Sequence, residues 1–438
     1  MSYFYLFSHC RLVQGFVNDA IFDLFQDRLL WINNPICRQA LRALQRGKSI
    51  EETFQEKDVD FTQISRFLDL LVAMDYGSYQ PRAIYSEKFR PFVLRSQEEK
   101  NVLHRPLARL VVELSSSCSL SCSFCGFKDG FATALCACGV WPDPSNNIKL
   151  NMSKLLSEVA ANGCQAVVVQ GGDPFLQREH LHALVQMATQ KGTPVSVHAP
   201  GVGLTEEDWV LINKHGVKLI VPVFGFDRET HDRIAGMRGA FEELSDVFNR
   251  FQAHYLKALE ARVILTSSNA DQRQRIVQML DDYGVQVSVE SYIPFEALSC
   301  ENNGSTHDLL ERSLKQSFRD FRVPIGIFFR LAKGHECWQD QLAVTLNGDI
   351  VPCLPARSHV IGSAVSESLL DILRLKRHYR YRDASRDSLA TCSGCEFRYA
   401  CRSCSLATEQ LVGSWQERSW QCRYDSTTGK WNPQIDPW

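Results

Sequence analysis

The sequence predicts an α/β protein built around a partial (β/α)6 barrel, with a smaller domain on either side of it. Three observations support this fold class. Short apolar segments alternate with helical segments from residue 107 onward, the first hundred residues have their own strand-then-helix pattern, and the last hundred are rich in cysteine. At 438 residues the chain is too long for one ordinary core. We therefore expect three domains, at residues 1–100, 107–315 and 324–438.

The N-terminal domain is expected to be a small winged-helix-like unit. Extended, alternating runs cover residues 3–16 and 20–32, and helical periodicity follows them. The first helix is expected after Asn34-Pro35, with an apolar face that includes Leu41, Leu44 and Ile50. A second helix is expected at residues 61–74.

The central domain shows strands and helices in unbroken alternation. Strands are expected at residues 110–114, 167–170, 194–198, 218–223, 261–266 and 285–289, and helices at 153–161, 178–189, 206–215, 241–257 and 271–283. This order implies right-handed crossovers and a parallel sheet. In such folds, ligands bind beyond the carboxyl ends of the strands.

Charge and hydropathy exclude several classes of function. A formal net charge of −2 and a pI near 6.6 leave no large basic surface, so we expect no nucleic-acid partner. No apolar run approaches the ~20 residues that span a bilayer, and the first residues lack the pattern of a signal peptide. We expect a soluble, cytoplasmic protein without a membrane partner. Because the cytoplasm keeps thiols reduced, metal explains sixteen cysteines better than disulfides do.

The first cysteine group is a CxxxCxxC array formed by Cys118, Cys122 and Cys125, directly after the first expected barrel strand. Three thiolates can hold one face of a cubane cluster and leave one iron without a protein ligand. That iron can chelate the amino and carboxylate groups of S-adenosylmethionine (SAM), so that an electron from the cluster yields a 5′-deoxyadenosyl radical. The alternative is a structural zinc site with Cys136 or Cys138 as fourth ligand.

Two neighbouring features favour the cluster. The second strand runs into Gly171-Gly172-Asp173-Pro174, where two glycines let the backbone approach a ligand and a carboxylate follows. Phe124 precedes the last cysteine, where its ring can cover an adenine, although simple loop packing explains it equally well.

Together these residues resemble the radical SAM superfamily, whose members carry CxxxCxΦC after the first strand and a GGEP-like sequence on the second. The resemblance implies that Cys118, Cys122 and Cys125 bind a [4Fe-4S] cluster. It also implies that the Gly171–Pro174 backbone and Asp173, here in place of the usual Glu, receive the SAM amino group. Residues 224–241 look like the segment after the fourth strand. Arg262 is a candidate for the SAM carboxylate or ribose, or else a surface charge.

The second cysteine group lies in the last hundred residues. Its spacing is Cys337-x10-Gly348-x4-Cys353, then Cys392-x2-Cys395-x5-Cys401-x2-Cys404, then Cys422. A CxxC pair followed by another CxxC also suggests a zinc ribbon. However, seven thiolates exceed one tetrahedral site and approach the eight that two cubanes need.

In this context the tail resembles a SPASM domain, which carries two auxiliary [4Fe-4S] clusters, giving three clusters with the first. The resemblance implies that Cys392, Cys395, Cys401 and Cys422 bind the outer cluster, and that Cys337, Cys353 and Cys404 bind the inner one. The last intra-motif spacing is two rather than three, and no eighth cysteine stands just before Cys337. The inner cluster is therefore expected either to have an open iron or to use Cys300, Cys136 or Cys138 as its fourth ligand.

Radical SAM proteins with SPASM tails often modify peptides, and the N-terminal unit resembles the leader-recognition element of peptide maturases. We expect a precursor peptide with a leader and an external electron donor of the flavodoxin or ferredoxin type as partners. The expected reaction is a carbon–carbon or ether crosslink on an aromatic residue, as in cyclophane formers, or a thioether. Alternatives are sulfatase-maturase-like oxidation of a Cys or Ser, a non-catalytic iron–sulfur or zinc protein, and a merely structural N-terminal cap. The sequence assigns no catalytic acid or base.

Overall fold

The computed structural model describes residues 2–54, 61–84, 106–122, 124–125, 130–132, 150–253, 256–294, 321–419 and 422–431. The chain forms two compact units. Unit 1 consists of Met1–Val102, Leu314–Gln339 and Asp383–Trp438, and unit 2 of Leu103–Ser313 and Asp340–Arg382. The segment expected to form the C-terminal domain is thus divided between the two units.

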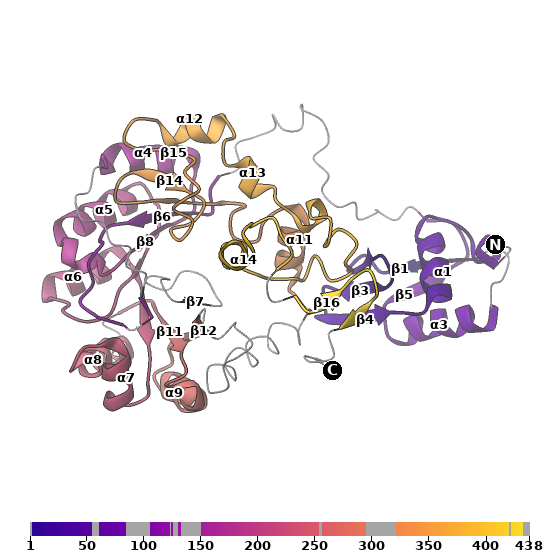
Figure 1. The fold of residues 1–438 in the computed structure, drawn as a ribbon, viewed down its shortest axis with the longest axis horizontal. Helices are drawn as coiled ribbons and strands as arrows, with labels where there is room; N and C mark the ends of the chain where they lie inside the picture. Colours follow the sequence, from indigo (N-terminus) through magenta and orange to yellow (C-terminus); the bar gives the residue numbers. More distant parts are fainter. Residues whose placement is uncertain are drawn as a thin grey trace. The chain divides into compact units, whose positions relative to one another are not determined.

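Unit 2 is built on the parallel sheet that the sequence predicts (Figure 1). Six parallel strands follow one another in chain order: β6 (Arg109–Glu113), β8 (Val167–Gln170), β9 (Val195–His198), β10 (Lys218–Val223), β11 (Leu259–Leu265) and β12 (Gln286–Pro294). β7 (Gly130–Ala132) pairs antiparallel with β12. At the other edge β13 (Gln341–Val344) adds in parallel to β6, and β14 (Asp349–Val351) and β15 (Gly362–Ser363) continue antiparallel.

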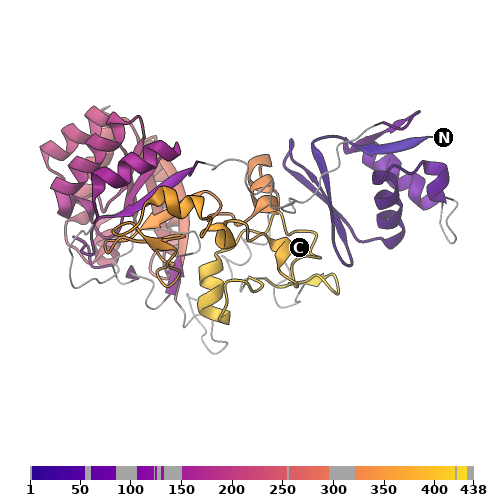
Figure 2. The same ribbon diagram turned by 90° about the horizontal axis from the view of Figure 1, so that it is seen from above.

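Helices cover the outer side of this sheet (Figure 2). They are α4 (Met152–Asn162), α5 (Arg178–Gln190), α6 (Glu206–His215), α7 (Arg228–Ala235), α8 (Ala240–Gln252) and α9 (Arg273–Asp282), with short turns η3 (Pro174–Gln177) and η4 (Ala270–Gln272) before α5 and α9. α12 (Leu369–Arg374) and α13 (Tyr379–Arg382) follow β15. The apolar faces of these helices and the outward side chains of the strands form the core.

The single helix expected at residues 241–257 is wrong in its bounds. α8 ends at Gln252, and α7 precedes it where no helix was predicted. α7 is largely polar, so apolar periodicity does not detect it, and Asp227 caps it by accepting from the Thr230 amide at 2.8 Å. Gly236, with φ of 64°, ends the helix in the left-handed region.

The N-terminal part of unit 1 contains two small sheets and three helices. β1 (Tyr3–Leu6) pairs with β5 (Gly77–Gln80), and β2 (Cys10–Gln14), β3 (Asp19–Asp23) and β4 (Arg28–Ile32) form an antiparallel sheet. α1 (Pro35–Gln45), α2 (Ile50–Phe54) and α3 (Phe61–Ala73) follow. The prediction that Ile50 belongs to the first helix is wrong, because the chain turns at Gly47, whose φ is 93°, and Ile50 opens α2.

The remainder of unit 1 has little regular structure. It contains α11 (Ile325–Lys333), η6 (Arg386–Ser388), α14 (Ser405–Val412) and a short hairpin of β16 (Tyr424–Asp425) and β17 (Lys430–Trp431). An aromatic cluster supplies part of its core, with Phe321 stacked on Phe397 at 4.3 Å between ring centroids. Across the described residues of both units, no helix is long and apolar enough to cross a membrane.

Candidate SAM and iron–sulfur sites

The first cysteine group lies on the loop that follows β6, as predicted. Burial raises the pKa of Cys118 to about 12, and the nearby thiol of Cys125 adds to this effect. Burial also raises the pKa of Cys122, with Cys125 and Cys118 again contributing. The three thiols therefore lie close enough to repel one another as thiolates, and a cation that binds them must displace their protons. Three converging sulfur donors fit one face of an iron–sulfur cubane.

Gly171 and Gly172 allow the end of β8 to press against this loop. Both have positive φ, 93° and 51°. A Cβ on Gly172 would clash with the carbonyl oxygen of Ser117, and one on Gly171 with the side chain of Glu113. The Asp173 amide donates to the same Ser117 carbonyl at 2.8 Å. The two glycines thus fix where the cysteine loop starts relative to the strand beside it.

Asp173 holds the cysteine loop through its side chain. It is 1% exposed, and burial raises the pKa of its carboxyl group. Oδ2 accepts from the Ser119 hydroxyl at 2.5 Å, and Oδ1 accepts from the Phe175 amide at 3.0 Å to cap η3. Pro174 opens η3 and is buried. A contact from Asp173 to the SAM amino group stays a prediction.

Residues 224–241 support the cysteine loop from the other side. The Ser121 amide donates to the Ala235 carbonyl at the end of α7 at 2.9 Å. A Cβ on Gly236 would clash with the Ser121 carbonyl, so the glycine that ends α7 also permits this close approach. The sequence indicated that this segment matters, and the structure shows that part of its role is to hold the loop.

Phe124 packs in an apolar cluster above the barrel. Its ring lies 5.4 Å from that of Phe224 and 5.3 Å from that of Tyr292, between centroids. Leu120 and Ile264 belong to the same cluster. Loop packing is therefore one role of Phe124, and covering an adenine stays a prediction.

Arg262 is not an exposed surface charge. Its side chain is 15% exposed, and Nε lies 3.4 Å from Glu290 Oε1 while Nη2 lies 3.5 Å from Glu260 Oε1. Glu290 is buried on β12, and burial raises the pKa of its carboxyl group to about 8 even though Arg262 opposes this shift. A role of Arg262 in binding SAM stays a prediction.

Sequence reasoning missed a buried row of polar side chains on the barrel strands. Gln170 Nε2 on β8 lies 3.1 Å from Nδ1 of His198 on β9, and Glu290 lies on β12. Burial lowers the pKa of His198 far below its usual value, and the Arg262 charge acts in the same direction, so its imidazole is neutral. Apolar periodicity gives no signal for them, because Gln170 and His198 end their strands and Glu290 is one of several polar residues on β12.

The predicted outer-cluster cysteines converge within unit 1. Burial raises the pKa of Cys401 to about 11, and the thiols of Cys422 and Cys392 contribute to the rise while Arg386 opposes it. Burial is the main cause of the raised pKa of Cys395, and the charges of Cys401 and Cys422 add to it. Four neighbouring thiols, one buried and three partly buried, fit a [4Fe-4S] cluster or a tetrahedral zinc site. We refer to this set as the outer site.

The predicted inner-cluster cysteines are divided between the units. Cys337 and Cys404 belong to unit 1, and Cys404 Sγ accepts from the Ala407 amide at 3.4 Å to cap α14. Cys353 belongs to unit 2 and is 2% exposed. This ligand set therefore stays a prediction. The proposed eighth ligands Cys300, Cys136 and Cys138 lie outside the described residues.

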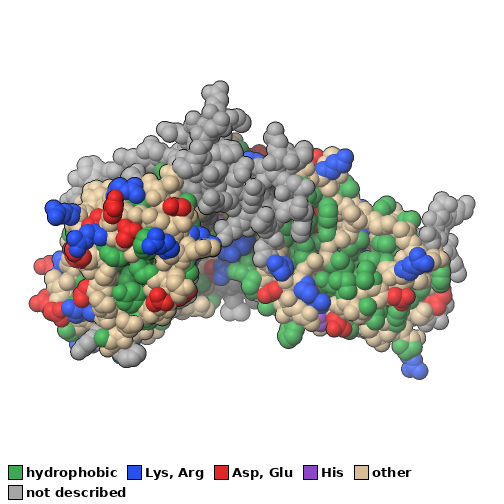
Figure 3. All heavy atoms as spheres, turned by 90° about the horizontal axis from the view of Figure 1, so that it is seen from below, with side chains coloured by type: hydrophobic (Ala, Val, Ile, Leu, Met, Phe, Trp, Pro, Cys, Tyr) green, Lys and Arg blue, Asp and Glu red, His purple; other side chains and the backbone are tan. Residues whose placement is uncertain are grey.

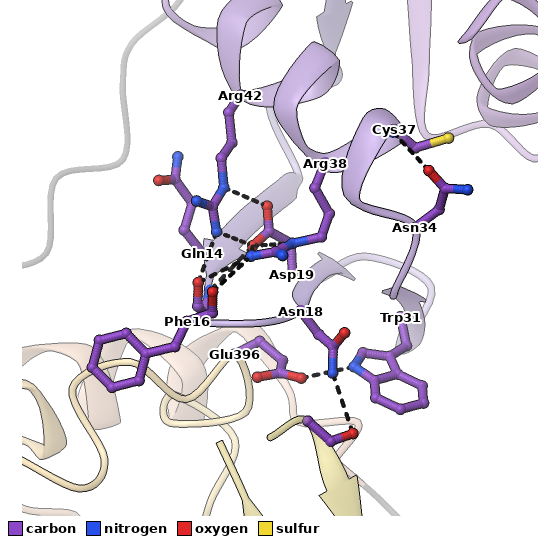
Figure 4. A network of polar contacts seen from close by, with 12 residues as sticks. Gln14, Phe16, Asn18, Asp19, Trp31, Asn34, Cys37, Arg38, Arg42 and Glu396 are labelled. Atoms are coloured by element: carbon purple, nitrogen blue, oxygen red, sulfur yellow. Dashed lines mark hydrogen bonds and ion pairs between the residues drawn. The ribbon is translucent and has the colours of Figure 1, made fainter. Parts of the chain in front are cut away.

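The N-terminal sheet is docked on the outer-site loop, residues 392–401 (Figure 4). Trp31 Nε1 on β4 donates to Glu396 Oε1 at 2.7 Å, and the Phe16 amide donates to the Gly394 carbonyl at 2.7 Å. The Phe16 ring packs so closely on Gly394 that a Cβ there would clash with it.

Residues next to the outer-site cysteines make further contacts to the N-terminal sheet. Arg398 Nη1 donates to the carbonyls of both Gln14, at 2.9 Å, and Cys395, at 2.8 Å. Asn18 Nδ2 donates to the hydroxyl of Tyr424 at 2.9 Å. Tyr424 lies two residues after Cys422, the last predicted ligand of the outer site. The N-terminal sheet and the outer site therefore form one packed assembly.

Two arginines of α1 brace the turn that makes these contacts (Figure 4). Asp19 is fully buried, and Arg42 Nε donates to its Oδ2 at 2.7 Å, while Arg38 Nε lies 3.4 Å from Oδ1. Arg42 Nη2 also donates to the Gly15 carbonyl at 2.8 Å, and Arg38 Nη2 donates to the carbonyls of Gly15 and Phe16 at 3.2 Å. The turn between β2 and β3 is thereby held in shape on the helix side.

A three-cysteine loop at the carboxyl end of a parallel α/β sheet, with a separate four-thiol site, defines a class of iron–sulfur barrel proteins. Comparison with known families makes the assignment specific. Residues 112–289 match the radical SAM superfamily model, and residues 337–396 match SPASM, an iron–sulfur cluster-binding domain. The chain therefore contains a radical SAM domain and a SPASM domain.

Similar proteins include enzymes that act on different substrates. Sporulation killing factor maturation protein SkfB of Bacillus subtilis (strain 168) is 26% identical over 174 residues, which is 40% of this chain and 39% of SkfB. AdoMet-dependent heme synthase of Methanosarcina barkeri (strain Fusaro / DSM 804) is 31% identical over 132 residues, 30% of this chain and 35% of the synthase. The chain thus matches well under half the length of these curated relatives.

A solved structure matches nearly the whole chain. Streptococcus suis SuiB bound to precursor peptide SuiA has a TM-score of 0.53 at 15% identity, covering 97% of this chain and 100% of SuiB. At that identity the likeness shows the fold, including the parts outside the barrel.

Proposed function

We propose that this protein is a peptide maturase that uses SAM and three [4Fe-4S] clusters to crosslink a ribosomally made precursor peptide. The observation that carries the proposal is the likeness to SuiB, which spans every part of the chain and includes a complex with a precursor peptide. The match to SkfB, a maturation protein, supports the same class of substrate. The cysteine count supports a reducing, cytoplasmic location.

The N-terminal part of unit 1 is the proposed binding site for the leader peptide. Among the described residues, β2 and β4 each pair only with β3, so each has one open edge to which an extended peptide can add as a strand. Figure 3 shows hydrophobic side chains gathered on part of the surface, and Phe61, Leu70 and Val72 of α3 are exposed apolar residues. They offer an apolar contact for the same peptide.

In the proposed reaction each crosslink removes two hydrogen atoms from the peptide. A reduced cluster with bound SAM supplies a 5′-deoxyadenosyl radical, which takes one hydrogen atom from an unactivated carbon. The new bond forms with loss of a proton and an electron, and the electron passes to a one-electron acceptor of the iron–sulfur class. Cys118, Cys122 and Cys125 hold the radical-generating cluster, and the Gly171–Asp173 segment holds their loop in place. A flavodoxin- or ferredoxin-type donor delivers the first electron.

SAM cleavage tests the enzymatic part of the proposal. Anaerobically reconstituted protein, reduced and given SAM, is expected to release 5′-deoxyadenosine. The variant with Cys118, Cys122 and Cys125 all changed to Ala is expected to release none. Zinc in place of iron, or no product from the wild type, would overturn the proposal.

Peptide turnover tests the substrate. Candidate peptides are those encoded by short reading frames beside the gene, and the expected product lacks two hydrogen atoms per crosslink, which mass spectrometry detects. Removing the leader is expected to lower kcat/KM by about 10²-fold or more, because tethering raises the effective concentration of the reacting segment. Oxidation of a Cys or Ser in a folded protein, without dependence on a leader, would favour the sulfatase-maturase-like alternative instead.

A further inference from the structure

The segment from η6 to Cys404 contains Arg386, Arg398 and Arg402, and they differ in how their charge is balanced. Arg398 Nε pairs with Asp387 Oδ1 at 2.7 Å. Arg402 Nε pairs with Glu336 Oε1 at 2.6 Å, and its side chain is 64% exposed. Arg386 pairs with no carboxylate among the described residues. Among the described residues its positive charge is therefore not held in an ion pair, and Glu336, which lines the same cavity, is paired with Arg402.

Arg386 points into the outer site. Nε donates to the Cys401 carbonyl at 3.1 Å, and Nη2 donates to the Ser403 hydroxyl. The thiolate forms of Cys401, Cys392 and Cys422 all attract the guanidinium. One cation thus contacts or faces three of the four predicted ligands, while hydrogen bonds to the backbone and to Ser403 fix its position.

The surroundings of the guanidinium keep its charge effective. It is partly buried and borders a partly open cavity of about 30 Å³, which has room for only a few waters. The lining includes His335, Arg386, Cys401, Ser403, Ser405 and Trp415. Arg418 also acts on Cys422, but its side chain is exposed, where water and salt screen it.

We propose that Arg386 is a positioning residue that raises the reduction potential of an iron–sulfur cluster held by Cys392, Cys395, Cys401 and Cys422. Four thiolates make such a site anionic, and an added electron makes it more so. A cation fixed beside the ligand cysteines therefore stabilises the reduced state more than the oxidised state. The inference rests on the proposed iron–sulfur occupancy of the outer site. It assigns this cluster a role in electron transfer rather than a purely structural one.

The test is a redox titration of the reconstituted full-length chain, followed by electron paramagnetic resonance. Cys118, Cys122 and Cys125 are changed to Ala so that only auxiliary clusters contribute to the signal. In Arg386→Gln, the ratio of reduced to oxidised outer cluster at a fixed potential is expected to fall about tenfold, which is about 59 mV for a one-electron couple. Arg386→Lys keeps the charge and should shift less. The double variant Arg402→Gln with Glu336→Gln removes both charges of a neighbouring ion pair, keeps the net charge, and should leave the potential nearly unchanged.

The outcomes separate this inference from the proposed function. Equal potentials in wild type and Arg386→Gln, with iron content intact, would overturn the role of Arg386 and leave the cluster assignment standing. A site that holds zinc, or shows no second redox couple, would overturn both. If Arg386→Gln does not retain iron, Ser403→Asp offers a second route, because a carboxylate beside Nη2 cancels the charge in place. Ser403→Asp should also lower the reduction potential of the outer cluster, and an unchanged potential in this variant would overturn the proposal.

Discussion

The two cysteine sites differ in the charges around them. The loop of Cys118, Cys122 and Cys125 lies among apolar rings and beside Asp173, and the charges that act on Cys118 and Cys122 are all negative. The outer site has a fourth thiol and the guanidinium of Arg386. Three ligands without a cation suit a cluster that binds SAM at an open iron, whereas four ligands with a cation suit one that only exchanges electrons. This difference in surrounding charge supports the proposed division of tasks between the two sites.

Removing cysteine ligands from one site at a time should have the largest effect and should separate the functions of the two sites. The Cys118, Cys122 and Cys125 to Ala variant should lose about four of roughly twelve irons per chain and all formation of 5′-deoxyadenosine. Cys401→Ala should lose a similar amount of iron but still cleave SAM in the absence of peptide. Iron analysis and product chromatography measure both, and loss of SAM cleavage in Cys401→Ala would show that the sites are not separate in function.

Gly172→Ala tests how closely the first site depends on its backbone. A Cβ there meets the Ser117 carbonyl and forces a non-glycine residue to φ near 51°, so we expect about 3 kcal/mol of destabilisation and poor cluster assembly. Chemical denaturation and iron content give the measurement. Gly192→Ala is the matched control, because Gly192 also has positive φ, 74°, but nothing lies within 4 Å of its added Cβ.

His231 should make the barrel sensitive to acid. Burial lowers the pKa of this histidine from 6.5 to about 4. The unfolded chain therefore binds a proton that the folded chain does not, and stability falls as pH drops below 6.5 and levels off near 4. We expect about 2 kcal/mol less stability at pH 5 than at pH 7 from this residue.

Urea denaturation of His231→Gln at both pH values checks this expectation, since the difference should shrink by that amount. His180→Gln is the control, because His180 is exposed on α5. An unchanged pH dependence in His231→Gln would mean that another group governs the loss.

Trp31→Phe should have the smallest effect and should act on unit 1. It removes the indole donor to Glu396, which is fully buried and keeps the Tyr424 hydroxyl as its other partner. Loss of a hydrogen bond to a charged group should cost about 1.5 kcal/mol. Tyr79→Phe, which removes a hydroxyl that bonds to Asp69 near the surface, should cost less. Equal effects in a thermal melt would argue against a special role for the docking contact.

The sequence predicted the barrel strands well because they are short apolar segments that alternate with helical segments. β8 and β10 agree with the predicted bounds residue for residue. α7 was missed because tertiary contacts and caps stabilise it rather than an apolar stripe. Arg386 and Glu290 could not be found either, since no spacing rule links an arginine or a carboxylate to ligands that only the fold brings near. The three-cysteine loop was found because its ligands are local in sequence.

The path of the chain between the two units has a consequence for how the protein is made. Residues 340–382 complete the edge of the barrel sheet, while the segments before and after them join the N-terminal part. The hydrogen bond from Trp31 to Glu396 cannot form until Glu396 has been synthesised, 365 residues later. At ~5–20 residues per second that interval is about 20–70 s. During translation the N-terminal sheet therefore presents an uncovered surface throughout this interval, so a chaperone has time to bind there first.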